Sequence, residues 1–366
     1  MSEPQQTLTL RQALGLAIQH HTAGRLSQAE TIYQQILQTD PDQPIALHLL
    51  GVIAHQVGRN DVAVDRITRA LHLKPDYVEA HNNLGNAFQA LGKLEEALTS
   101  YRKALDLKPD YADAHNNLGV ALKELGQTEE AMASYRRALK LKPDYVDAHN
   151  NLGSVLMDLG RLEDAVASYD KALVIKPDFA EAHNNLGNAL QKLNRPEKAA
   201  ASYRKALDLN PQYAEAHYNL GAALHDLDRL EDAVASYDKA LVIKPDFAEA
   251  HNNLGTVLRK LDKMDRAVAS CQKALDLKPD YVEAHCNLGN ALKELGKLEE
   301  AVGSYRKALD LKPDYIQAHN NLGNALHDLG RLDEAVTSYN KALAIKPALG
   351  DVHNNLGNVL EALDKP

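Results

Sequence analysis

Apolar residues recur along the chain at the three- and four-residue steps that place them on one side of a helix. In residues 78–91 this stripe comprises Ala80, Leu84, Ala87, Phe88 and Leu91. A second stripe follows Gly92 and comprises Leu94, Ala97, Leu98, Tyr101, Ala104 and Leu105. Polar residues fill most of the remaining positions, as in amphipathic helices that bury one face. We therefore predict two helices joined by a short turn.

Turn and cap residues mark the ends of these predicted helices. Gly92 accepts a left-handed backbone, which ends the first helix. Pro109 ends the second helix, because the residue before a proline is pushed out of the helical region. Asp76 and Glu79 stand three residues apart and predict a capping box at the start of the first helix. Pro196 falls at the start of a second helix, where a missing N–H costs nothing.

Prolines set the period of the whole chain. They fall 34 residues apart, at Pro41, Pro75, Pro109, Pro143, Pro177, Pro211, Pro245, Pro279, Pro313 and Pro347. Self-similarity at a fixed period is typical of a solenoid, in which each repeat stacks only on its neighbours. The length of 366 residues alone would suggest two or three globular domains, whereas the period predicts one elongated domain. The segment LEDAVASYDKALVIKPDFAEAHNNLG occurs at 162–187 and again at 230–255, so recent duplication explains part of the identity between repeats.

The 34-residue pattern resembles the tetratricopeptide repeat in its Leu84–Gly85 step, its small residues Ala97 and Ala104, its aromatic Tyr101 and its terminal proline. The resemblance divides the chain into ten units and a terminal helix, at 10–43, 44–77, 78–111, 112–145, 146–179, 180–213, 214–247, 248–281, 282–315, 316–349 and 350–363. It implies an all-α fold, a right-handed α-solenoid superhelix forming a single domain over 1–366. It also implies that the first helix of every repeat lines the concave side.

Two adjacent asparagines precede the Leu-Gly step in most repeats, as in DYVEAHNNLGNAF at 76–88. The second of them is unbroken over nine repeats, at Asn83, Asn117, Asn151, Asn185, Asn219, Asn253, Asn287, Asn321 and Asn355. A side-chain amide offers a donor and an acceptor, as does each peptide unit of an extended chain. We therefore predict that this row binds the backbone of an extended protein or peptide. A solvated surface residue and a bridge between helices of neighbouring repeats are the alternatives.

This row is similar to the Asn-lined superhelix of the O-GlcNAc transferase family and its bacterial relatives, which implies extended protein substrates. The first asparagine of each pair is less regular, because Tyr218 and Cys286 replace it in two repeats. We expect this first position, as at Asn82, to decorate the groove. Cys286 is then expected to face the groove and to be the better site for chemical labelling. Cys271, which replaces the aromatic of its repeat, is expected in the core.

Acidic residues form a third periodic series near the start of the first helices, at Glu79, Asp113, Asp147, Glu181, Glu215, Glu249, Glu283 and Asp351. A carboxylate there caps backbone amides and suits the helix dipole, which is the favoured interpretation. The same series could instead form an acidic groove edge that favours basic peptides. Acids and asparagines also disfavour the family's clamp for a chaperone's C-terminal carboxylate, which needs Lys or Arg at these positions.

Composition narrows the classes of partner and cofactor. A net charge of -9 disfavours nucleic acid as the main partner. No stretch is long and apolar enough to cross a bilayer, no leader opens the chain, and the two cysteines form no CxxC pair, so we expect a cytoplasmic protein. Histidines also recur with the period, but neighbouring repeats stack ~10 Å apart and metal ligands lie within ~2 Å of one ion. We therefore expect the histidines to be packing residues, and no metal or cofactor.

No catalytic motif stands out, because the chain has no Gly-rich phosphate loop, no HExxH and no nucleophile elbow. We predict a non-catalytic scaffold that binds extended segments of partner proteins. The alternative is a substrate-recruiting arm of a larger O-GlcNAc-transferase-like enzyme, because 350–363 has the pattern of a first helix without its partner. Sequence beyond residue 366 would decide between the two. Self-association through the solenoid ends is a third, weaker alternative.

Overall fold

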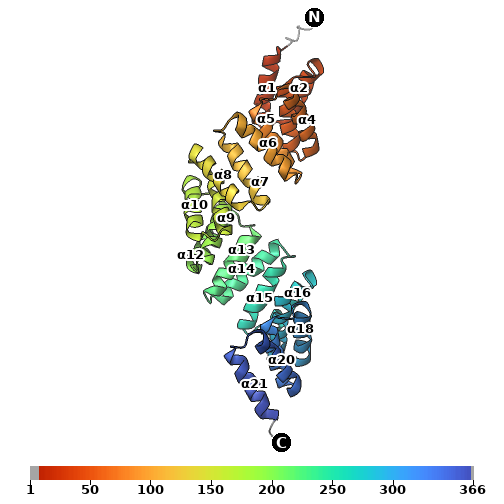
Figure 1. Ribbon diagram of the computed structural model, residues 1–366, viewed down its shortest axis with the longest axis vertical. Coiled ribbons are helices and arrows are strands. Elements are labelled where there is room, and N and C mark those ends of the chain that lie inside the picture. Colours follow the sequence, from red (N-terminus) through yellow and green to blue (C-terminus); the bar gives the residue numbers. More distant parts are fainter. Residues whose placement is uncertain (1–7, 364–366) are drawn as a thin grey trace. The chain divides into compact units, whose positions relative to one another are not determined.

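A computed structural model describes residues 8–363 of the chain (Figure 1). All regular structure within this range is α-helical, in 21 helices, which confirms the prediction of an all-α solenoid. The chain forms two compact parts, one up to Pro177 and one from Asp178 onward, and each is described by itself. None of the described helices combines the length and the apolar character needed to cross a membrane.

Helices alternate in two classes along the chain, with odd-numbered first helices and even-numbered second helices. The N-terminal part contains α1 (Leu10–Thr22), α2 (Leu26–Thr39), α3 (Pro44–Gln56), α4 (Asn60–Leu73), α5 (Val78–Ala90), α6 (Leu94–Leu107), α7 (Ala112–Glu124), α8 (Thr128–Leu141), α9 (Val146–Asp158) and α10 (Leu162–Ile175). The C-terminal part contains α11 (Ala180–Lys192), α12 (Pro196–Leu209), α13 (Ala214–Asp226), α14 (Leu230–Ile243), α15 (Ala248–Lys260), α16 (Met264–Leu277), α17 (Val282–Glu294), α18 (Leu298–Leu311), α19 (Ile316–Asp328), α20 (Leu332–Ile345) and α21 (Gly350–Leu363).

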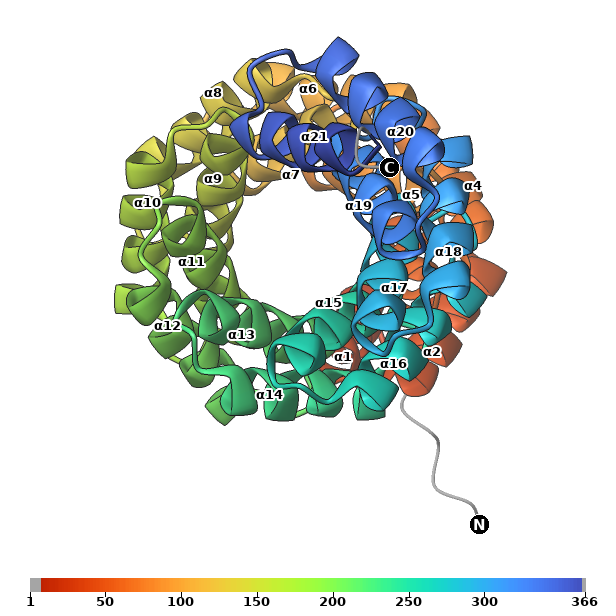
Figure 2. The ribbon, with the colours of Figure 1, turned by 90° about the horizontal axis from the view of Figure 1, so that it is seen from below.

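Packing between helices follows one rule within each part. A first helix packs against the second helix of its own repeat, and that second helix packs against the next first helix. Consecutive first helices also contact one another, as α5 contacts α7 and α15 contacts α17, whereas no comparable contact joins consecutive second helices in the described chain. Within each part the first helices therefore lie on the inner side of the curve and the second helices on the outer side (Figure 2).

A glycine and an aromatic ring set the close approach of the two helices of a repeat. The ring of Tyr305 on α18 is fully buried and lies directly against Gly289 on α17. A Cβ on Gly289 would lie 2.5 Å from Tyr305 Cε1, closer than real Cβ contacts allow. Cys271 occupies the equivalent core position in its own repeat and is fully buried, as predicted. The glycine of the Leu-Gly step thus leaves the space that the aromatic ring occupies.

Left-handed residues end the first helices, as the sequence predicts. Gly92 follows α5 with φ 71°, a backbone region that glycine enters without steric cost. Three repeats reach the same conformation without glycine, at Asn194, Asp228 and Asp262, with φ of 56°, 57° and 58°. Asparagine and aspartate are the other residues that tolerate this region. Pro196 is the first residue of α12, which confirms its predicted position.

The predicted capping box is wrong. α5 begins at Val78, so its N-cap residue is Tyr77, and no side chain caps the helix. Asp76 stands one residue too early to accept from the first backbone amides. Tyr77 holds the cap position because its half-buried ring packs against the core, with Lys74 Nζ 4.7 Å from the ring centroid. Glu79 still lies in the first turn of α5, where a carboxylate suits the helix dipole.

The periodic histidines tie each first helix to the loop that precedes it. His81 Nε2 lies 2.8 Å from the carbonyl oxygen of Pro75, and His319 Nε2 lies 2.9 Å from that of Pro313. Because a carbonyl only accepts, each imidazole donates through Nε2. The histidines therefore pack, as expected, and also satisfy a carbonyl group at the turn. Among the described residues, no three His, Cys, Asp or Glu side chains are placed to hold a metal ion.

Candidate protein-binding face of the first helices

The predicted asparagines form a row on the inner face of the first helices within each part. We call them the amide row, with Asn83, Asn117 and Asn151 in the N-terminal part and Asn185, Asn219, Asn253, Asn287, Asn321 and Asn355 in the C-terminal part. Every member is half-buried. The row lies where consecutive first helices approach one another, between α5 and α7 or between α15 and α17. Each amide is therefore held at a helix–helix seam and is partly open to solvent.

Eight amides of the row reach back to the preceding repeat. Asn117 Nδ2 donates to Asn82 Oδ1 at 3.1 Å, across the seam between α7 and α5. The same bond recurs from Asn151 to Asn116 at 3.1 Å, from Asn219 to Asn184 at 3.0 Å, from Asn287 to Asn252 at 2.8 Å and from Asn355 to Asn320 at 3.3 Å. The bridge between neighbouring repeats, one of the alternatives from the sequence, is thus a property of the row.

Three repeats make the same bond with a different partner. Asn83 Nδ2 lies 2.9 Å from His48 Nε2, Asn253 Nδ2 lies 3.1 Å from the Tyr218 hydroxyl, and Asn321 Nδ2 lies 3.8 Å from Cys286 Sγ. Imidazole, hydroxyl and sulfur can all accept a hydrogen bond. The first position of the pair therefore supplies a hydrogen-bond acceptor even where it is not asparagine. We call the residues at this position, from His48 and Asn82 to Asn320, the acceptor row. The sequence alone shows these replacements only as breaks in the pattern.

Most of the acceptor row is buried, and Tyr218 and Asn320 are half-buried, contrary to the expectation that this position decorates the groove. Asn82 exposes 4% of its surface, and Asn116, Asn150, Asn184 and Asn252 are buried as well. Cys286 exposes only 3%, and burial raises the pKa of its thiol to about 11. The expectation that Cys286 faces the groove and is the better site for labelling is therefore wrong. These positions point along the seam toward the next first helix, which covers them.

In some amides both N–H groups are bonded, because a second acceptor lies within reach of the nitrogen. Asn117 Nδ2 also donates to Asn86 Oδ1 at 3.1 Å, and Asn86 in turn accepts from the Tyr101 hydroxyl at 2.8 Å. An amide nitrogen carries two hydrogens, so both N–H groups of Asn117 are used. Its Oδ1 accepts one bond, from Asn116 Nδ2 at 3.3 Å. One lone pair of that oxygen remains, and it can accept from a bound partner.

A second series of bridges crosses the same seams near the C-terminal ends of the first helices. Gln89 donates to Glu124 at 2.7 Å, and Lys293 pairs with Asp328 at 3.2 Å. The equivalent pairs elsewhere are Lys123 with Asp158, Gln191 with Asp226 and Arg259 with Glu294. A donor and an acid 35 residues apart are the sequence signal that would have revealed this series. The series forms a charged border beside the amide row.

The periodic acids are partly neutralised by their own repeats. Glu215 lies 3.6 Å from Lys244 Nζ, and Glu249 lies 3.9 Å from Lys278 Nζ. The carboxylates lie in the first turns of α13 and α15. Pairing and position favour a structural role at the helix start over an acidic edge reserved for basic peptides, in line with the interpretation preferred from the sequence.

The fold and this face define an α-solenoid of helix-turn-helix repeats, a class of protein that binds other proteins through surfaces built from many repeats. Family models described as TPR repeat match residues 86–126, 121–160, 153–194, 255–296, 289–330 and 323–364. A model described as tetratricopeptide repeat matches residues 14–78 and 184–246. Because these matches cover most of the chain, it belongs to the tetratricopeptide repeat family.

Solved structures with the same repeat resemble this chain over different lengths. One chain of the APC/C hetero-tetramer Cut9–Hcn1 is matched over 89% of its length by 95% of this chain, with a TM-score of 0.56 and 15% identity. PilF of Pseudomonas aeruginosa matches 57% of this chain and 94% of its own, with a TM-score of 0.52 and 24% identity. YrrB, described as a TPR protein with an unusual peptide-binding site, matches 50% and 95%, with a TM-score of 0.44 and 26% identity. No curated protein matches the sequence.

Proposed function

We propose that this tetratricopeptide repeat protein is a scaffold that binds an extended segment of a partner protein along the amide row. The observation that carries the proposal is the fixed orientation of the amides. Each described bridge holds an Asn side chain at a seam, half-buried, with its nitrogen turned toward the preceding repeat. The carbonyl oxygen of each amide is then the group offered to a partner. Recognition through the backbone tolerates many partner sequences, which suits a scaffold.

The polarity of the bridges sharpens what the partner must supply. Asn117, Asn321 and Asn355 each donate to two acceptors, so their N–H groups are occupied. At these three amides a bound segment must therefore donate its own backbone N–H groups to the amide oxygens. The backbone N–H groups of an extended segment are available, because they are not bonded within a helix. The proposed partner is an unstructured or extended segment, and a folded helix would not fit this role because its N–H groups are already bonded.

Repetition explains how weak single contacts add up to useful affinity. One hydrogen bond contributes about 0.5–1.5 kcal/mol net, which corresponds to roughly a twofold to tenfold change in Kd. A row of such contacts on rigid helices loses little entropy on binding, because the bridges already fix the side chains. A segment that spans several repeats within one part can then bind well, whereas a segment of one or two residues cannot.

The experiment uses extended peptides that bind the full chain on a peptide array. The best binder is resynthesised with N-methyl groups on alternate backbone nitrogens, which removes the donors that the amide oxygens require. The proposal predicts at least a tenfold loss of affinity in fluorescence anisotropy, and a much smaller loss when the methyl groups are placed on side chains. Equal binding of the backbone-methylated peptide would show that the amide row does not hold the peptide backbone.

A further inference from the structure

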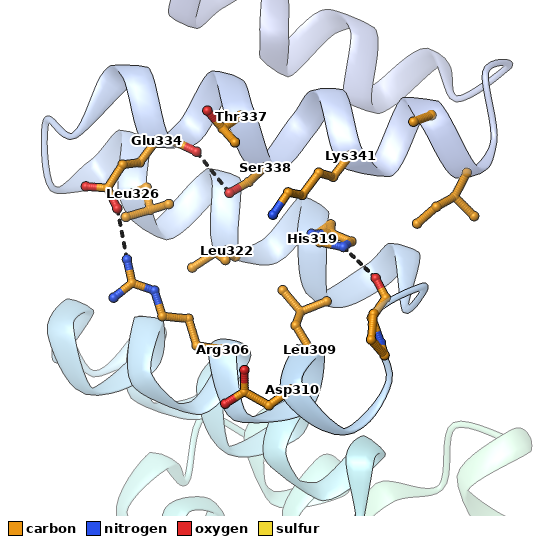
Figure 3. A pocket seen from close by; sticks show the side chains of 13 residues that line it. Arg306, Leu309, Asp310, His319, Leu322, Leu326, Glu334, Thr337, Ser338 and Lys341 are labelled. Atoms are coloured by element: carbon orange, nitrogen blue, oxygen red, sulfur yellow. Dashed lines mark hydrogen bonds and ion pairs between the residues drawn. The ribbon is translucent and has the colours of Figure 1, made fainter.

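Hollows open between consecutive second helices, on the face opposite the amide row. They lie between α8 and α10, between α12 and α14 and between α18 and α20, with volumes of about 640, 900 and 680 Å³. Figure 3 shows the third, with Arg306 and Leu309 on one wall, Lys341 on the other and His319 with Leu322 on the floor. These hollows exist because second helices do not contact one another as the first helices do within each part.

Two of these grooves share the sequence of one wall. Helices α10 and α14 have the same sequence, LEDAVASYDKALVI, so each groove receives the same Lys and Val from that side. The facing walls are α8 in one groove and α12 in the other. At equivalent positions these walls carry Lys140 and Asp208. The chain therefore contains a natural pair of grooves that share one wall and carry opposite charges at an equivalent position of the other wall.

The groove between α8 and α10, which we call the α8–α10 groove, is the basic one. Arg136, Lys140 and Lys171 line it and are exposed, and only one acid, Asp170, joins them in the lining. No ion pair within the described residues engages these three cations. Three unneutralised positive charges in one groove give a local field that attracts anionic groups.

The other two grooves are neutralised by their own acids. The α12–α14 groove carries Asp208 where the α8–α10 groove carries Lys140. Its other acids are common to both grooves, because the pair of Arg229 with Asp232 recurs at the start of α10 as Arg161 with Asp164. In the α18–α20 groove, Arg306 pairs with Glu334 at 2.9 Å across the two walls, as Figure 3 shows. The α12–α14 and α18–α20 grooves therefore have balanced charges in the same architecture. The α8–α10 groove differs from them in having an excess of positive charge.

Apolar groups line the same basic groove. Leu152 forms part of its floor, and Leu139, Val174 and Ile175 form its sides. Val174 exposes 82% of its surface, an unusual exposure for a large aliphatic residue at the rim of a groove. His149 lies beside Leu152, where burial lowers the pKa of its imidazole, so the floor stays uncharged at neutral pH. The groove thus combines an apolar interior with a cationic rim.

We infer that the α8–α10 groove docks an amphipathic helix of a partner protein, whose apolar stripe is flanked by Asp and Glu. A helix that lays an apolar face into a groove between helices is a recurrent recognition mode. The cationic rim selects acidic flanks by charge complementarity. This site lies on the opposite face from the amide row, so the N-terminal part can hold an extended segment and a helix together. The inference does not depend on the proposed function of the amide row.

The test uses two synthetic helical peptides of about four turns, labelled for fluorescence anisotropy with the full chain. One carries leucine along one stripe and glutamate on both flanks, and the matched control carries lysine in place of glutamate. We expect the glutamate peptide to bind one site per chain, and the lysine peptide not to bind. Lys140→Asp reproduces the wall charge of the α12–α14 groove and should weaken binding about tenfold or more. Asp208→Lys should add a second site.

Several outcomes would overturn the inference. Equal affinity for the two peptides would show that charge complementarity does not select the partner. Unchanged binding by Lys140→Asp would show that the peptide binds outside the α8–α10 groove. Binding of anionic lipid vesicles that depends on Lys140, without binding of the glutamate peptide, would identify a membrane surface as the occupant. Aspartate is the residue of other repeats at this exposed position, so circular dichroism of Lys140→Asp should match the native protein. Binding of the glutamate peptide should also survive substitution of Asn151 to Ala.

Discussion

The asparagine side chain of the amide row divides its hydrogen-bonding groups between two tasks. Its nitrogen donates to the preceding repeat, as Asn287 donates to Asn252 at 2.8 Å. Its oxygen is the group that we propose contacts a partner, and in some repeats it accepts one long bond from the neighbouring asparagine, as in the 3.3 Å contact from Asn252 to Asn253. A side chain with both a donor and an acceptor is suited to this division, because an ionised carboxylate has no donor and an ammonium group has no acceptor. This accounts for an unbroken row of one residue type.

A matched pair of glycines tests the close approach of ring and helix. Gly289→Ala would place its Cβ 2.5 Å from the fully buried ring of Tyr305, so we expect a loss of about 1–3 kcal/mol of unfolding free energy. Gly303 also lies within a helix of the C-terminal part, but a Cβ added there would meet no neighbouring atom within 4 Å. Gly303→Ala should therefore gain about 0.5–1 kcal/mol. Urea denaturation measures both, and changes of the same sign would contradict the packing described.

His48 gives one seam a dependence on pH. Burial, followed by the nearby His21, lowers the pKa of His48 to about 4, against 6.5 in the unfolded chain. The neutral form is therefore the one that the fold stabilises, and this stability is complete above pH 6.5 and lost as the pH falls toward 4. Protonation would also turn the nitrogen that accepts from Asn83 into a donor.

The comparison of wild type with His48→Asn isolates this effect, because other repeats carry asparagine at that position. Between pH 8 and pH 5 the wild type should lose about 2 kcal/mol more unfolding free energy than the variant. Urea denaturation at the two pH values measures the difference, and the titration of the remaining histidines cancels in it. An equal loss in both proteins would mean that His48 is not held neutral at the seam.

At the scale of helices, two sets of bridges join consecutive first helices, and they differ in burial. The bridge between Asn287 and Asn252 is buried at its acceptor, whereas Lys293 and Asp328 are both partly exposed. Removing a buried partner costs about 1–3 kcal/mol, and an exposed ion pair contributes about 0.2–1 kcal/mol. The inner seams therefore depend on the amides more than on the charges.

This difference predicts the order of two variants. Asn252→Ala should lower the unfolding free energy by about 1–3 kcal/mol, and Asp328→Ala by less than about 1 kcal/mol. Hydrogen exchange would show the loss of protection in α15 and α17 for the first variant and a smaller loss in α17 and α19 for the second. A larger effect of Asp328→Ala would mean that the charged series, rather than the amides, holds the seams.

The helices themselves could be predicted from the sequence, because apolar spacing, Gly92 and the periodic prolines act locally. The prediction of a capping box was wrong by one residue, because Tyr77 is the N-cap residue and its ring packs against residues distant in sequence. The amide row was predicted as a row, but its bonds run between residues 35 apart. Those contacts depend on how consecutive first helices approach, which no local pattern specifies. Burial of Cys286 was missed for the same reason.

At the scale of the whole molecule, the residues that all repeats share produce the same fold in each repeat. The residues that differ between repeats can then determine which partner binds. Stability in such an array is approximately a sum of repeats and nearest-neighbour seams, so surface residues that vary between repeats are free to serve binding. Lys140 against Asp208 is one such difference, and it can be interpreted only once the structure shows which walls face each other. The period of 34 residues identifies the architecture, and a departure from it, at Lys140, marks the second binding surface that we propose.

The central claim, that the amide row itself contacts the partner, is tested most directly by two double variants that break the same bridges. For a peptide mapped to the C-terminal part, Asn219→Ala with Asn287→Ala removes the amides, whereas Asn184→Ala with Asn252→Ala removes only their buried acceptors. Anisotropy with the array-selected peptide, on protein shown to be folded by circular dichroism, should give at least a tenfold loss of affinity for the first pair and less than about threefold for the second. Equal losses in the two pairs would show that the asparagines only join the repeats.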